Sequence, residues 1–196
     1  MISAPFLKWL TSVALPATTP QLTTTFAWMG IQSCFLGCGA NAAHRSTIFQ
    51  FFPLVRRGRV GAEFFTYLKG TTPAYEGLVI DIYDGTNHSY AELRLDANAR
   101  TASIISPTGT HIIATNIFPL ILFETFLPVK LVVDMDTDKY VRLMIGPDEF
   151  DISAYDLMPV GGTTQKLLTI SIFCQGGAAG IISSDVDNFI LTQNEP

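Results

Sequence analysis

Three aspartates, Asp134, Asp136 and Asp138, stand at alternate positions between two apolar runs in the stretch KLVVDMDTDKYVRLMI. Carboxylates at this spacing are typical either of a calcium-binding loop or of a tight turn between two strands. An EF-hand loop would need glycine and glutamate where this chain has Lys139 and Ile145. The aspartates therefore predict a β-hairpin, with calcium binding as the alternative.

The polar and apolar residues of this hairpin separate onto two faces only if its loop has three residues, 136–138. That register forms the pairs Leu131–Leu143, Val133–Val141 and Asp134–Tyr140, the last on the polar side. The last loop position is expected to be left-handed, a conformation that aspartate tolerates.

A second hairpin is predicted in GLVIDIYDGTNHSYAELRL, where Gly85 and Thr86 suit a type II′ turn. Its register gathers six apolar residues on one face: Leu78, Ile80, Ile82, Ala91, Leu93 and Leu95. The other face carries Val79, Asp81, Tyr83, His88, Tyr90, Glu92 and Arg94.

The second face has the side chains that carbohydrate binding requires. Tyr83 and Tyr90 offer flat rings for sugar C–H groups, while charged side chains such as Arg94 hydrogen-bond hydroxyls. Further polar residues alternate on RVGAEFFTYL and on the second strand of the first hairpin. The full set of candidate ligand-binding residues is Glu63, Tyr67, Asp81, Tyr83, His88, Tyr90, Glu92, Arg94, Tyr140 and Arg142. The competing interpretation is that these residues form only the solvated side of an antiparallel sheet.

Catalysis is a further alternative. Asp81 and Glu92 lie diagonally across the second hairpin, with backbones about 7–8 Å apart. Glycosidases use two carboxyl groups about 5–9 Å apart, one as acid and one as nucleophile or base. The chain lacks the E-x-D-x-E run of some glucanases, and His88 with Tyr90 would suit lyase chemistry instead.

The elements that must position these residues are strands. After residue 47, short runs of alternating apolar residues are interrupted by turn clusters every 8 to 12 residues, among them DGTN, SPTG and GPDE. This pattern predicts one all-β domain, a two-sheet antiparallel β-sandwich over residues 47–196. Residues 1–46 are expected to be an N-terminal arm or the opening strands.

Composition limits the partners. The 196 residues are 48% hydrophobic, and the net charge of -5 excludes a nucleic-acid backbone as the main partner. The longest chargeless run, 101–123, contains two prolines and a glycine, so no membrane span is expected. Surplus apolar surface favours a homo-oligomer. The N-terminus makes a weak secretory signal, which leaves localisation open.

The three cysteines, Cys34, Cys38 and Cys174, do not have zinc-site spacing. We expect buried free thiols, and a disulfide between two of them is the alternative.

The stretches KLVVDMDTDKYVRLMIGPDEFDIS and SSDVDNFILTQNEP resemble the late strands of concanavalin A-like, laminin G-like jelly-roll domains. GRVGAEFFTYLKG, LVIDIYDG and AELRLDA are similar to their early strands, so the resemblance covers residues 50–196. It implies two curved sheets with a concave face. In many relatives that face or its rim binds carbohydrate, while other relatives bind proteins or act as glycoside hydrolases or polysaccharide lyases. It also implies a structural calcium near the termini, for which Asp185 and Asp187 are the candidate ligands.

The sequence thus favours a non-catalytic carbohydrate-binding or recognition module. A structural or protein-interaction sandwich within an oligomer is the first alternative, and a polysaccharide-active hydrolase or lyase is the second.

Overall fold

The structure is a computed structural model that describes residues 9–14, 18–24, 27, 32–39, 41, 43–53, 58–69, 75–117, 126–177 and 182–196. Every regular element in these ranges is a strand, so the all-β prediction is confirmed. The strands are β1 (Leu10–Ala14), β2 (Thr18–Thr23), β3 (Ser33–Cys38), β4 (Arg45–Pro53), β5 (Arg59–Lys69), β6 (Tyr75–Asp84), β7 (Asn87–Asp96), β8 (Thr101–Ser106), β9 (Gly109–Thr115), β10 (Leu127–Asp134), β11 (Lys139–Ile145), β12 (Asp148–Asp151), β13 (Met158–Gly162), β14 (Lys166–Gln175) and β15 (Ile182–Gln193). The described ranges contain no helix with the length and apolarity that a membrane crossing requires.

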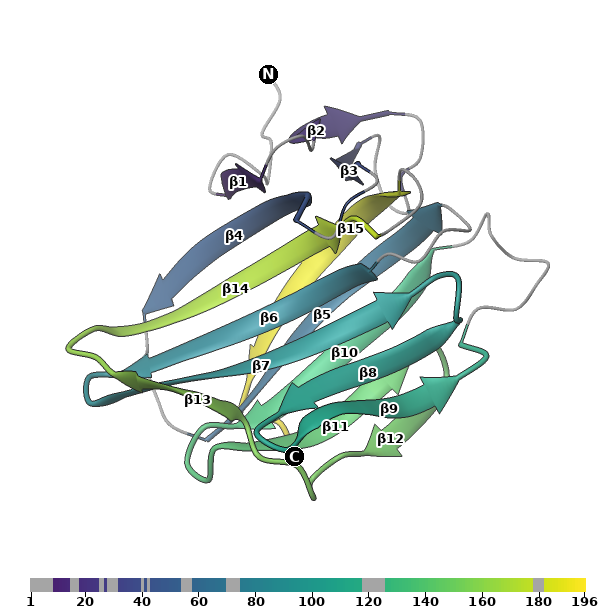
Figure 1. Cartoon of the computed structure of the whole chain (residues 1–196). Helices are drawn as coiled ribbons and strands as arrows, with labels where there is room; N and C mark the ends of the chain where they lie inside the picture. Colours follow the sequence, from purple (N-terminus) through teal and green to yellow (C-terminus); the bar gives the residue numbers. More distant parts are fainter. Residues whose placement is uncertain are drawn as a thin grey trace.

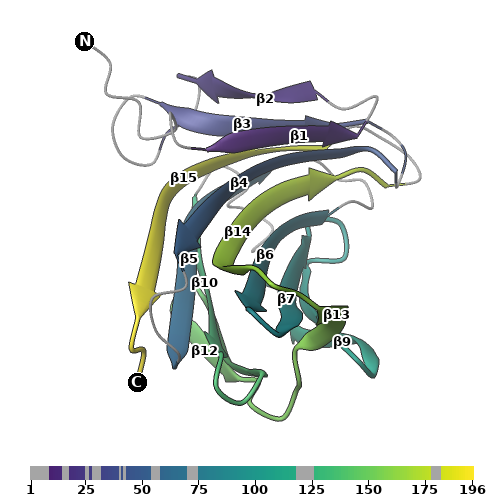
Figure 2. The ribbon, with the colours of Figure 1, turned by 90° about the vertical axis from the view of Figure 1, so that its left-hand side faces the viewer.

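The strands form two antiparallel sheets that pack face to face, as Figure 1 shows. Sheet A has the order β1-β4-β14-β6-β7-β8-β9, and β13 also pairs with β7. Sheet B has the order β12-β11-β10-β5-β15-β3-β2. In Figure 2 the strands of sheet A bend so that its outer face is concave, with sheet B on the other side. The two-sheet sandwich predicted from the sequence is therefore confirmed.

The β6–β7 hairpin has the predicted register. Tyr83 lies opposite His88, Ile80 opposite Ala91, and the turn between the strands has Gly85 at a φ of 91°. Its six predicted apolar residues are all buried between the sheets. Because side chains alternate along a strand, the predicted polar residues of both strands lie on the outer face of sheet A.

The β10–β11 hairpin is also present, but two of its three predicted pairs are wrong, because Val133 lies opposite Tyr140 and Asp134 opposite Lys139. The loop between the paired strands therefore has four residues, 135–138, where three were predicted. Leu131 lies opposite Leu143 as expected, whereas a bulge after Val132 places Tyr140 opposite Val133. The bulge turns the Tyr140 side chain from the polar side into the core, where it is fully buried.

The loop of this hairpin agrees with the turn interpretation of the aspartates. An Asp134 carboxylate oxygen accepts hydrogen bonds from the backbone N–H groups of Asp136 and Thr137, at 2.9 and 3.2 Å. Asp138 has a φ of 50°, which confirms its expected left-handed conformation. Its carboxylate also accepts a hydrogen bond from the Ser89 hydroxyl of β7, at 2.8 Å.

A substitution series at Asp138 tests the left-handed conformation. Asp138→Ala should lower the free energy of unfolding by about 1–2 kcal/mol more than Asp138→Gly, because only glycine has no Cβ penalty at positive φ. Both variants lose the bond from Ser89, so this loss cancels in the comparison. Urea unfolding with and without calcium measures the difference. Equal stabilities would contradict the left-handed turn, and a calcium-dependent stability lost in both variants would favour the calcium alternative.

The described strands before residue 46 pair into both sheets. β1 pairs with β4 at the edge of sheet A, and β3 pairs with β15 in sheet B. β2 pairs with β3 and forms the edge of sheet B, at the opposite edge from β12.

Candidate functional site

The candidate site lies on the concave face, which we define as the outer side of β4, β14, β6 and β7. Between β6 and β7, Asp81 lies opposite Tyr90, Val79 opposite Glu92, and Gly77 opposite Arg94. β14 pairs with the other edge of β6, so its side chains extend the same face. Six predicted residues meet here: Asp81, Tyr83, His88, Tyr90, Glu92 and Arg94.

Asp81, His88 and Tyr83 form one interacting group. The His88 Nε2 atom lies 2.9 Å from Asp81 Oδ1, and the His88 ring stacks on Tyr83 with centroids 4.0 Å apart. Burial raises the pKa of Asp81, and the contact with His88 opposes that shift. Burial and then the Asp81 charge raise the pKa of Tyr83. These contacts fix an acceptor, an imidazole and a flat ring before any ligand arrives.

Glu92 and Arg94 form a second group on β7. The Arg94 Nε atom donates to Glu92 Oε1 at 2.6 Å, and Glu92 is almost fully buried. The Arg94 guanidinium also lies 5.6 Å from the centroid of the Tyr75 ring. This ion pair holds a carboxylate and a guanidinium close together on the β7 side of the concave face.

Arg45 of β4 completes the charged cluster. Its guanidinium lies 3.6 Å from the centroid of the buried Phe173 ring. Burial lowers the pKa of Arg45, while the charges of Glu92 and Asp81 act in the opposite direction. Beneath the ring is Gly77, where a Cβ would approach Phe173 Cζ to 2.3 Å. The absence of a side chain at Gly77 therefore leaves room for the Phe173 ring close to β6, where the Arg45 guanidinium packs over it.

The β4 side of the face is aromatic. Phe49 and Phe51 lie opposite Ser171 and Thr169 of β14, so both share the concave face. Their rings meet edge to face with centroids 5.6 Å apart, and Phe51 is 53% exposed. Arg45, Phe49 and Phe51 were not among the site residues predicted from the sequence. The alternation in RSTIFQFFP is the signal that places all three on one side of a strand.

A cavity of about 570 Å³ adjoins the cluster at the edge of β7. β8 pairs with the second half of β7 and β13 with the first half, so the cavity opens where these two strands diverge. Its lining includes His88, Ser89, Asp138, Asp156 and Pro159. His88 thus belongs both to the concave face and to this cavity.

Four predicted site residues lie elsewhere. Glu63 and Arg142 belong to sheet B, where Arg142 donates to Glu195 at 2.8 Å. Tyr67, also of sheet B, is buried, and its ring centroid lies 5.7 Å from that of Phe126. Tyr140 lies in the core. These four residues therefore do not lie on the concave face with Asp81, and a role for them in ligand binding stays a prediction.

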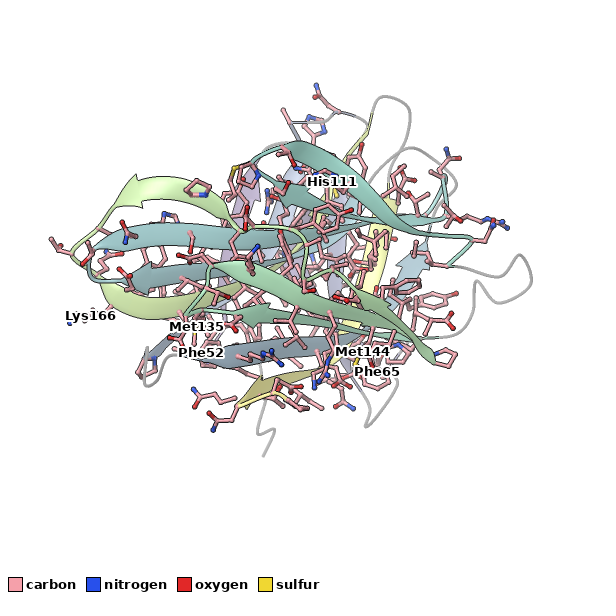
Figure 3. All side chains as sticks on the ribbon, turned by 90° about the horizontal axis from the view of Figure 1, so that it is seen from below. Phe52, Phe65, His111, Met135, Met144 and Lys166 are labelled. Atoms are coloured by element: carbon pink, nitrogen blue, oxygen red, sulfur yellow. The ribbon has the colours of Figure 1, made fainter. Side chains whose placement is uncertain are left out.

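β5 and β11 belong to sheet B, across the core from the concave face. In Figure 3, which views the molecule from below, Phe65 of β5 and Met144 of β11 appear at one side of the sheets and His111 of β9 at the other. Residues of β5 and β11 therefore do not contribute to the concave face.

The predicted calcium ligands Asp185 and Asp187 lie on β15 and are buried. Asp185 is opposite Phe35 of β3 and Tyr67 of β5. Within the described ranges, no three His, Cys, Asp or Glu side chains come together as a metal site would require. Calcium at Asp185 and Asp187 stays a prediction.

No protein-family model and no curated protein matches the sequence. The fold does match solved structures. "Cellulose induced protein, Cip1" superposes with a TM-score of 0.60 at 14% identity, covering 97% of this chain and 94% of that one. The metal-free lectin I-B4 of Griffonia simplicifolia gives 0.57 at 9% identity, covering 97% and 94%. Lectin UEA-II complexed with galactose gives 0.53 at 8% identity, covering 94% and 92%. At these identities the likeness shows the fold alone, so the predicted two-sheet sandwich is confirmed as a fold of the kind that these lectins have.

Proposed function

We propose that this protein is a non-catalytic carbohydrate-binding module whose ligand lies on the concave face of sheet A. The observation that carries the proposal is the cluster in which Asp81, Glu92, Arg45 and Arg94 are fixed on the same face as the part-exposed Tyr90 and the exposed Phe51. The proposal is supported by analogy of fold, since lectin UEA-II, complexed with galactose, shares this fold.

The chemistry of the face matches that of a sugar. Each sugar hydroxyl both donates and accepts a hydrogen bond, and the cluster presents carboxylate acceptors together with guanidinium donors. The C–H faces of a sugar ring prefer flat aromatic surfaces, which Tyr90 and Phe51 offer. An open, curved sheet face suits an extended oligosaccharide better than an enclosed small molecule.

The contacts of the two carboxylates favour binding over catalysis. Asp81 Oδ1 lies 2.9 Å from His88 Nε2, and Glu92 is paired with the Arg94 guanidinium, so each carboxylate already has a side-chain partner. A glycosidase acid must carry a proton at the start of the reaction. The raised pKa of Asp81 is the one feature that favours the enzyme alternative, and the experiment must distinguish the two.

Calorimetric titration with neutral and acidic polysaccharides tests the proposal. With the glycan that binds, Tyr90→Ala and Asp81→Asn should each weaken affinity about tenfold or more, equivalent to a loss of about 1.4 kcal/mol. Phe65→Ala and Glu63→Gln make matched changes on sheet B and should leave affinity unchanged. An equal loss in these controls would place the ligand elsewhere.

The alternatives give different results in the same experiment. Release of reducing ends or unsaturated products that stops in Glu92→Gln would establish the enzyme alternative. If no glycan binds at millimolar concentration and light scattering shows a concentration-dependent oligomer, the structural alternative replaces the proposal.

A further inference from the structure

Two cysteines that are far apart in the sequence meet between the sheets. Cys38 ends β3 in sheet B, and Cys174 lies near the end of β14 in sheet A. Their Sγ atoms are 2.6 Å apart, although the residues are separated by 136 positions. Both side chains are buried in the core, so the contact bridges the two sheets.

The backbone around this contact is held closely. The N–H of Gly176 donates to the carbonyl oxygen of His44 at 2.8 Å, next to β14. A Cβ at Gly176 would lie only 2.0 Å from the carbonyl oxygen of Gly39, the residue that follows Cys38. The segments that follow Cys38 and Cys174 are therefore held close together beside the sulfur contact.

We propose that Cys38 and Cys174 form a disulfide that joins sheet A to sheet B when the protein folds in the presence of a disulfide oxidant such as oxidised glutathione. One cysteine thiolate attacks a sulfur of the oxidant, which forms a mixed disulfide and releases one glutathione thiolate. The second cysteine thiolate attacks the protein sulfur of that mixed disulfide and releases the second glutathione. The two cysteines lose two protons and two electrons, and the electrons reduce the oxidant to two thiols.

The burial of the pair predicts when the disulfide forms. The hydrogen bond between the two thiols and the burial of Cys174 raise the pKa of the Cys174 thiol, so little of its thiolate is present in the folded state. An external oxidant must therefore react before the sheets close. Refolding with oxidised glutathione should form the disulfide rapidly, whereas adding it to the folded, reduced protein should act slowly.

Cysteine counting tests the proposal on the unmodified sequence. After refolding with oxidised glutathione, the protein is unfolded and alkylated with iodoacetamide. We expect one label, on Cys34, and a peptide map that links Cys38 to Cys174. The same protein treated with a reductant should take three labels. Three labels without reductant, or a link that involves Cys34, would overturn the proposal.

The melting temperature gives a second measurement. The cross-link closes a long loop in the unfolded chain, so the oxidised protein should melt about 10 °C above the reduced one. Cys34→Ser should keep this difference and Cys38→Ser should abolish it. Equal melting temperatures of cross-linked and reduced wild-type protein would contradict a stabilising link between the sheets.

Discussion

The free energy of unfolding should fall by about 4 kcal/mol as the pH rises from 4.5 to 8, because of one buried carboxyl group. Glu76 of β6 points between the sheets and is fully buried. The Thr66 hydroxyl, from sheet B, donates a hydrogen bond to its carboxyl group. Burial raises the pKa of Glu76 to about 8, although the hydroxyl groups of Thr66 and Ser184 act in the opposite direction.

The sign follows from proton counting. Between pH 4.5 and 8 Glu76 is protonated in the folded state and ionised in the unfolded state, so unfolding releases a proton. Rising pH therefore favours unfolding across this window. The stabilising effect is fully present below pH 4.5 and is lost as the pH passes through 8.

Glu76→Gln should flatten this dependence, because a neutral amide of the same shape replaces the carboxyl. Urea unfolding at several pH values between 5 and 9 measures the slope for both proteins. Glu63→Gln, a matched change outside the core on sheet B, should leave the slope as in the wild type. If Glu76→Gln retains the wild-type slope, Glu76 is not the titrating group.

Tyr140→Phe should lower the free energy of unfolding by about 1–3 kcal/mol, although it removes a single oxygen atom. The Tyr140 hydroxyl donates to the carbonyl oxygen of Ile105 at 2.6 Å and accepts from the N–H of Glu92 at 2.9 Å. The change leaves both backbone groups without this partner inside the core. Burial also holds the pKa of Tyr140 well above its ordinary value.

Tyr155→Phe is the matched control for this prediction. Tyr155 is partly exposed, and its ring centroid lies 4.5 Å from that of His111. This variant should change stability by less than about 0.5 kcal/mol. Denaturant unfolding measures both variants, and equal effects would contradict the link that Tyr140 makes between the sheets.

The β6–β7 hairpin could be predicted residue by residue, because its turn and the division of its side chains between two faces depend only on residues close together in the sequence. Gly85 supplies the positive φ of a two-residue turn, and the alternation of side chains then fixes every pair. The same rule failed at Tyr140, because a bulge inserts one residue and reverses the faces beyond it. Alternation contains no signal for such an insertion.

The rest of the site depends on strand order, which is not local. β5 follows β4 and precedes β6 in the chain, yet it lies in the other sheet, between β10 and β15. Alternation along β5 therefore could not show that Glu63 lies in the opposite sheet from Asp81. On the side away from β7, β6 pairs with β14. This pairing places Phe173 next to Gly77, although the two residues are almost a hundred positions apart in the sequence.

The most direct test of the account is a chemical-shift titration of ¹⁵N-labelled protein with a soluble oligosaccharide of the glycan class that binds. We predict that the shifted amides belong to β4, β6, β7 and β14, with the largest changes near Asp81, Tyr90 and Glu92. Changes centred on β10 and β11 near Arg142, or no changes at millimolar ligand, would contradict carbohydrate binding on the concave face.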